Sequence, residues 1–186
     1  MPKKQNASVS WADVKKRLKS LDERQVFDLI KGLYELSPEN KRFVGARLGQ
    51  ADGESFDAHK REIVECLNPP FDDQLDLRRG RKAISSYKKA VPKDLEGLLD
   101  LMLVYVESGN TFTMDYGGID EPFYDSLCSM MSSIQKLAPK VSIGAHADCA
   151  RRLKVMDDMP DIGWGYSDWL ADVTEAVETS LQKRNS

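Results

Sequence analysis

Apolar side chains recur every three or four residues along most of the chain, which is the spacing of one face of an α-helix. The stretch DERQVFDLIKGLYEL shows the pattern clearly, with Val26, Ile30 and Leu33 on one side and charged residues between them. Comparable stripes predict helices near residues 10–21, 22–36, 37–48, 54–68, 76–90, 94–109, 121–134, 140–156 and 166–181. We therefore expect an all-α protein, with about eight or nine helices in a single bundle or in stacked helical hairpins.

Residues that begin and end helices fall between these stripes. Ser10, Asp22 and Ser37 are N-cap candidates, because a short polar side chain accepts hydrogen bonds from the first turn of a helix. The helix before Gly109 is apolar on nearly every side, which favours a central and buried position. We expect Gly109 to end that helix, and the TFTM sequence at 111–114 is the sole candidate strand.

Size and composition indicate a globular protein. The 186 residues are 41% hydrophobic and 31% charged, and the longest apolar run, LMLVYV at 101–106, is far too short to span a bilayer. We predict a disordered tail at 1–9 and one helical domain at 10–183, or two lobes divided near 69–77. Three widely spaced cysteines without a CxxC pair, and a first segment without an apolar run, favour a cytoplasmic location.

The charge is distributed unevenly along the chain. The net charge is −3, yet residues 1–93 carry 20 basic and 14 acidic side chains, whereas residues 94–186 carry 7 basic and 16 acidic. Residues 94–135 contain eight acids and no lysine or arginine. Such asymmetry bears on partners, or on how the two halves meet, more than on the fold.

The most basic segment is RRGRKAISSYKKAVPK at 78–93, which holds seven basic side chains and no acid. On a helix these side chains form a broad face that suits an acidic protein partner, the acidic half of a second copy, or the phosphates of a nucleic acid. A solvated helix without a binding role is the plain alternative. The candidate contact residues are Arg78, Arg79, Arg81, Lys82, Lys88 and Lys89.

The stretch YGGIDEPFYDSL at 116–127 combines acids, aromatic rings, glycines and a proline. Asp120 is the expected cap of the next helix, with Glu121 in its first turn and Ile119 and Tyr124 as a hydrophobic staple. A second stretch, DIGWGYSDWL at 161–170, precedes the last helix, and its aromatic side chains suit either packing or partner binding. We predict a pocket between the two stretches, formed by Asp115, Tyr116, Asp120, Glu121, Tyr124, Trp164, Tyr166, Asp168 and Trp169.

Catalytic and metal-binding patterns are weak. Neither His59 with Cys66 nor His146 with Cys149 has the spacing of a zinc site, and His59 lies on an apolar stripe that favours a core position. We expect no metal, no cofactor and no membrane association. A hydrolase or nuclease using a divalent metal is an alternative, with ligands drawn from Asp115, Asp120, Glu121, Asp125, and Asp161 or Asp168.

Three segments carry a family resemblance. LYELSPENKRFVGARL, VESGNTFTMDYGGIDEPFYDSL and DIGWGYSDWL, in this order, resemble segments of a family of small bacterial helical proteins of unassigned function. The resemblance spans roughly residues 15–175 and implies a bacterial cytoplasmic protein, without an activity, a cofactor or catalytic residues. The function expected from all of this is a non-enzymatic binding or adaptor protein that contacts a protein partner through the basic helix and the aromatic loops. A nucleic-acid-binding regulator and the metal-dependent hydrolase are the alternatives.

Overall fold

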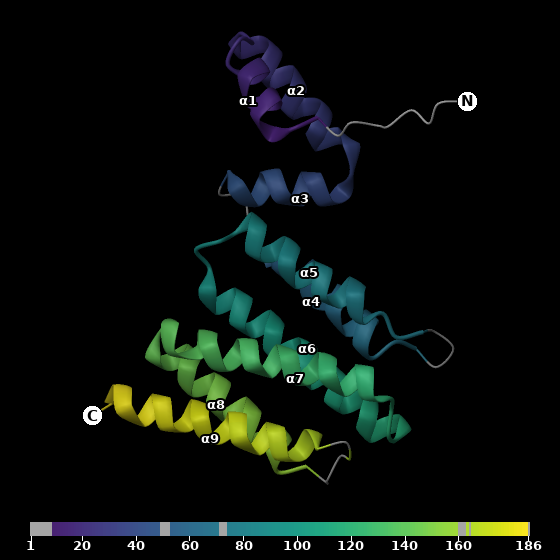
Figure 1. Ribbon diagram of the computed structural model, residues 1–186, viewed down its shortest axis with the longest axis vertical. Helices are drawn as coiled ribbons and strands as arrows, with labels where there is room; N and C mark the ends of the chain where they lie inside the picture. The colour runs from purple at the N-terminus through teal and green to yellow at the C-terminus, as the bar shows by residue number, and fades with distance from the viewer. Residues whose placement is uncertain (1–8, 49–52, 71–73, 160–162, 164, 186) are drawn as a thin grey trace. The chain divides into compact units, whose positions relative to one another are not determined.

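The computed structural model describes residues 9–48, 53–70, 74–159, 163 and 165–185. The described residues are 83% helical and form nine α-helices and no strand, which confirms the predicted all-α class. Residues 1–8, most of the predicted N-terminal tail, lie outside the described residues. The elements are α1 (Trp11–Leu18), α2 (Glu23–Leu36), α3 (Pro38–Arg47), α4 (Gly53–Leu67), α5 (Leu77–Ala90), α6 (Leu95–Tyr116), α7 (Glu121–Leu137), the 3₁₀ turn η1 (Ala138–Lys140), α8 (Ile143–Asp157) and α9 (Tyr166–Asn185) (Figure 1).

The chain divides into two compact units, residues 1–44 and 45–186. The N-terminal unit holds α1, α2 and most of α3, and the C-terminal unit holds α4 to α9. Helices α4 and α5, on either side of residues 69–77, contact each other closely within the C-terminal unit.

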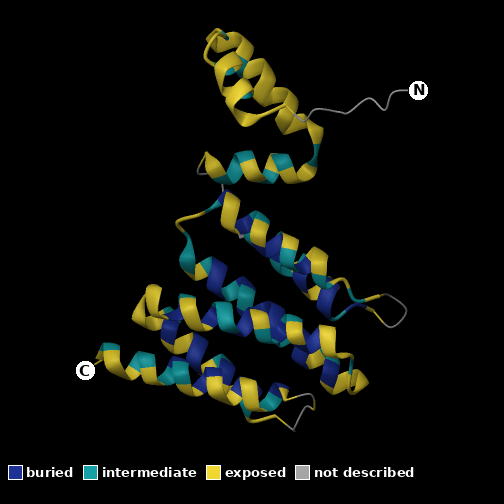
Figure 2. Ribbon diagram, in the orientation of Figure 1, coloured by how far each residue is buried: buried dark blue, intermediate teal, exposed yellow. Residues whose placement is uncertain are grey.

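Local hydrogen bonds define the helix starts of the N-terminal unit. Ser10 Oγ accepts from the backbone N–H of Asp13 at 3.2 Å. Asp22 and Gln25 form a reciprocal capping box, in which each side chain accepts from the other's backbone N–H at 2.8 and 3.0 Å. The cap at Ser37 also forms, so all three predicted caps are confirmed. Even so, no described residue of this unit is buried (Figure 2).

The C-terminal unit is built around α6. This helix contacts α4, α5, α7 and α8, while α9 packs on α7 and α8. Its side chains Leu101, Tyr105 and Val106 are fully buried, as are Leu127 of α7 and Leu153 of α8. The sequence prediction of a central, buried helix is confirmed.

The predicted end of this helix at Gly109 is wrong, because α6 continues to Tyr116 and contains the candidate strand 111–114. Gly109 serves packing instead: a Cβ there would lie 2.6 Å from Leu127 Cδ2, so the missing side chain lets α7 approach. The helix ends at Gly117, which takes a φ of 85° that other residues rarely adopt.

A shared carboxylate joins the end of α5 to the start of α6. The Tyr87 hydroxyl donates a short hydrogen bond to Asp94 Oδ2, and Asp94 Oδ1 accepts from the backbone N–H of Gly97 at 2.8 Å as the N-cap of α6. Burial raises the pKa of Tyr87, and the hydrogen bond to Asp94 raises it further. A Cβ at Gly97 would collide with the Tyr87 oxygen, so the contact requires glycine at that position.

Candidate functional site

Five of the six predicted contact residues on α5 are exposed, and the four without an ion pair among the described residues, Arg78, Lys82, Lys88 and Lys89, are called the basic face below. At 3.6 residues per turn Arg78, Lys82 and Lys89 form one row, and Lys88 lies beside it. None of the ion pairs found in the described chain involves these four side chains. Their positive charge is therefore presented to solvent.

The other two candidates, Arg79 and Arg81, are bound within the C-terminal unit. Arg79 Nε donates to Glu62 Oε1 of α4 at 3.1 Å. Arg81 donates from Nε to Ser126 Oγ at 3.0 Å and from Nη2 to the Ser126 carbonyl at 2.7 Å, and its guanidinium lies 5.8 Å from the ring centroid of Tyr105. These contacts connect α5 to its neighbours, so fewer unpaired cations are open to a partner than the sequence predicts.

The acidic, aromatic stretch forms the joint between α6 and α7. Asp120 Oδ1 accepts from the backbone N–H of Phe123 at 3.0 Å, which confirms the predicted cap. The buried Tyr124 folds back so that its hydroxyl oxygen accepts from the backbone N–H of Ile119 at 3.2 Å. Asp120 and Tyr124 therefore shape the joint itself.

The other candidate carboxylates in and next to this stretch, Asp115, Glu121 and Asp125, are exposed. Within the described ranges no group of three His, Cys, Asp or Glu side chains gathers in a way that could hold a metal ion. Asp161, a candidate ligand in the hydrolase alternative, lies outside the described residues.

The two aromatic stretches meet through Tyr124 and Tyr166. Their ring centroids lie 5.5 Å apart and both side chains are buried, so this contact belongs to the core. Tyr116 and Trp169 are exposed, at 47% and 42%, and Asp168 is exposed as well. Trp164 lies outside the described residues.

Both histidines are buried, as the apolar stripe predicted for His59, whose ring packs edge-on against Tyr87. His146 Nδ1 lies 3.1 Å from Arg184 Nη1, and because a guanidinium only donates, this nitrogen must accept. The proton is therefore on Nε2, which donates to the Val177 carbonyl at 3.1 Å. Burial and the Arg184 charge lower the pKa of His146, against the raising effect of the Val177 hydrogen bond, so its neutral form ties α8 to α9.

The cysteines are all free thiols. Cys66 and Cys149 are buried and Cys128 is half-buried, and burial raises the pKa of each, to about 12 for Cys149. The thiols stay protonated at neutral pH, where they are poor nucleophiles.

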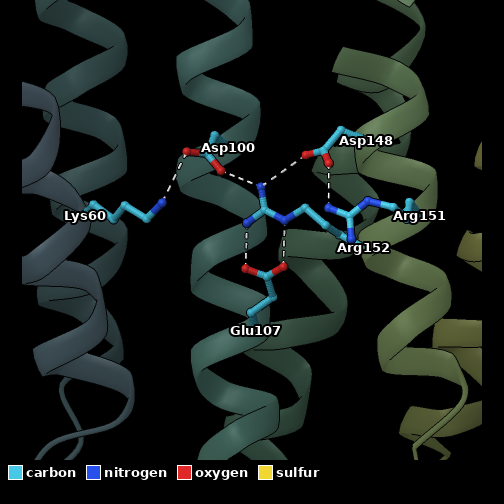
Figure 3. Close-up of polar contacts among 6 residues, drawn as sticks. All are labelled: Lys60, Asp100, Glu107, Asp148, Arg151 and Arg152. Atoms are coloured by element: carbon cyan, nitrogen blue, oxygen red, sulfur yellow. Dashed lines mark hydrogen bonds and ion pairs between the residues drawn. The ribbon is translucent and has the colours of Figure 1, made fainter. Parts of the chain in front are cut away.

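An ion network around Arg152 of α8 was not predicted from the sequence (Figure 3). Arg152 donates from Nε and Nη2 to both carboxylate oxygens of Glu107 at 2.6 and 2.5 Å, and it also bonds Asp100. Asp148, one turn earlier, lies 3.7 Å away, and Lys60 of α4 pairs with Asp100 at 3.6 Å. Burial lowers the pKa of Arg152, but the hydrogen bonds to Glu107 and Asp100 outweigh this effect and raise it overall.

The Arg152 network pairs part of the acidic half of the chain with a cation. Two acids from the lysine-free and arginine-free stretch, Asp100 and Glu107, are paired with Arg152 in the described chain, whereas the basic face of α5 pairs with none of them. The four-residue spacing of Asp148 and Arg152 is the only part of the network that the sequence pattern indicates, since the other members come from separate helices.

The described residues include no helix long and apolar enough to cross a membrane. Comparison of the chain with protein-family models, with curated proteins and with solved structures finds no match in any of the three.

Proposed function

We propose that this chain is a non-enzymatic binding protein whose basic face contacts an acidic partner protein. One observation carries the proposal: Arg78, Lys82, Lys88 and Lys89 are exposed on one helix without an ion pair in the described chain, while their neighbours Arg79 and Arg81 are bound to Glu62 and Ser126. Arg79 and Arg81 bind the helix to α4 and α7, so the backbone that carries the four charges is held in place.

The contact expected from such a face depends on salt. A single exposed ion pair contributes about 0.2–1 kcal/mol, so four of them give specificity and speed of association more than tight binding. The exposed rings of Tyr116 and Trp169 are proposed as a second contact surface, because aromatic side chains are favoured anchors in interfaces. The proposal includes a bacterial cytoplasmic location, which is supported by the motif resemblance and the three free thiols.

The test is cross-linking and affinity capture from a bacterial lysate with the full chain as bait. The triple variant Arg78→Glu, Lys82→Glu and Lys89→Glu should lose the acidic partners that the wild type retains at 50 mM salt. The matched control changes Lys136, Lys140 and Lys183 to Glu, which alters the charge equally at other exposed positions of the same unit. Equal capture by both variants would show that the basic face is not the contact.

A nucleic acid is the second candidate, because a row of unpaired cations on a helix can displace counterions from phosphates. Gel mobility shift with unrelated DNA and RNA at low salt tests it directly. A shift that the triple variant abolishes and the control variant keeps would favour the nucleic acid over the protein partner.

A further inference from the structure

The second helix carries a broad apolar surface that nothing in the N-terminal unit covers. On α2, six side chains are 41% to 75% exposed and form what is called the apolar face below: Phe27, Leu29, Ile30, Leu33, Tyr34 and Leu36. Together with the half-buried Val26 they span one side of the helix at 3.6 residues per turn.

Four of the five charged residues of α2 lie on the opposite side. Arg24, Asp28, Lys31 and Glu35 project away from the apolar face at helical spacing, and Lys31 pairs with Glu35 at 3.9 Å. Glu23, in the first turn, is the one charged residue of α2 on the apolar side, so the rest of the apolar face can be covered without burying an ionised side chain.

The face is large for a unit of this size. Because an aromatic or large aliphatic side chain carries on the order of 150–250 Å² of surface, the six leave roughly 500 Å² in water. A specific interface buries about 800 Å² on each partner, and Trp11 of α1, itself 70% exposed, adds to the same unit. Isolated helices shorter than about 12–15 residues are only marginally stable in water. Helices α1 and α2 span 8 and 14 residues, and neither contains a buried side chain.

We propose that the apolar face of α2 binds the same face of a second copy of this chain. A two-fold axis through the face places it against the same residues of the second copy, so that apolar side chains meet apolar side chains. The helices α1 and α2 of two chains then form a four-helix bundle, with the apolar residues inside and the charges of α2 in water. This inference uses the N-terminal unit alone and does not rest on the proposed function of the basic face.

The test measures the mass of the full chain in solution. Light scattering on a sizing column and sedimentation equilibrium should give twice 21.0 kDa for the wild type at tens of micromolar. The variant Ile30→Asp with Leu33→Asp should weaken the dimer more than about 100-fold and elute as a monomer. The control variant Lys31→Ala, on the charged side of α2, should dimerise like the wild type.

Hydrogen exchange of the wild type gives a second measurement that needs no variant. Amides of α2 should gain protection as the protein concentration rises through the dissociation constant. A wild type that stays monomeric at 200 µM overturns the proposal, and protected α2 amides in that monomer would show that the chain covers the face itself. A dimer that survives the double substitution also overturns it, since another surface then holds the copies together.

Discussion

Replacing Arg152 by methionine should destabilise the C-terminal unit markedly. The Arg152 side chain is 14% exposed, and its guanidinium bonds both oxygens of Glu107, at 2.6 and 2.5 Å, as well as Asp100. Methionine keeps most of the buried stem of the side chain but leaves the two carboxylates without their main cation. Breaking a fully buried pair costs about 3–5 kcal/mol.

That figure must be reduced here because the carboxylates regain water. Their side chains are 31% and 35% exposed, so a loss of about 2–3 kcal/mol is the expected effect on the free energy of unfolding. For a unit of this length the melting temperature should fall by roughly 5–10 °C. Urea and thermal unfolding followed by circular dichroism measure both quantities.

The neighbouring arginine provides the control. Arg151 pairs with Asp148 at 2.6 Å, but the two side chains are 66% and 49% exposed. Arg151→Met should therefore cost no more than about 0.5 kcal/mol. If the two substitutions destabilise the protein equally, the reasoning from burial and bidentate bonding is refuted. A double-mutant cycle with Glu107→Gln should give a coupling energy of about 1–3 kcal/mol.

Three further substitutions test separate contacts. Gly109→Ala should cost about 1–2 kcal/mol despite the higher helix propensity of alanine, because its Cβ would press on Leu127; a urea midpoint equal to that of the wild type would contradict this. The pKa of His146 is lower in the folded protein than its value of 6.5 in the unfolded chain. The stabilisation by its neutral form is therefore complete above pH 6.5, and it is lost as the pH falls through the folded pKa. Urea unfolding from pH 7.5 to 5 should show this decline in the free energy of unfolding, and His146→Gln should flatten it. Tyr87→Phe should cost about 1–2 kcal/mol, because it removes the hydroxyl that donates a hydrogen bond to Asp94. An unchanged melting curve would show that this hydrogen bond adds nothing to the stability.

Features that depend on neighbours in the sequence were predicted well. The caps at Ser10, Asp22, Ser37 and Asp120 involve residues three positions apart, so the pattern contains all the information that the hydrogen bonds need. The apolar run of α6 likewise predicts a buried helix, whatever the path of the rest of the chain.

Features that depend on distant residues were not predictable in this way. Gly109 looks like a helix end until Leu127 of α7 is seen to fill its space. Arg81 and Lys82 are adjacent and alike in sequence, yet Ser126 of another helix binds the first and the second remains exposed. The Arg152 network joins α4, α6 and α8, and no single segment holds enough of its members to show it.

The Asp94 joint between α5 and α6 gives the basic face a further property. The Asp94 carboxylate caps the central helix and also accepts a hydrogen bond from the Tyr87 hydroxyl. Arg81 fixes the middle of α5 against α7. The helix backbone under the basic face thus has little conformational freedom left to lose. A partner that docks there meets a preorganised surface, and the entropy lost on binding falls mainly on the four long side chains, at about 0.5–1.5 kcal/mol each.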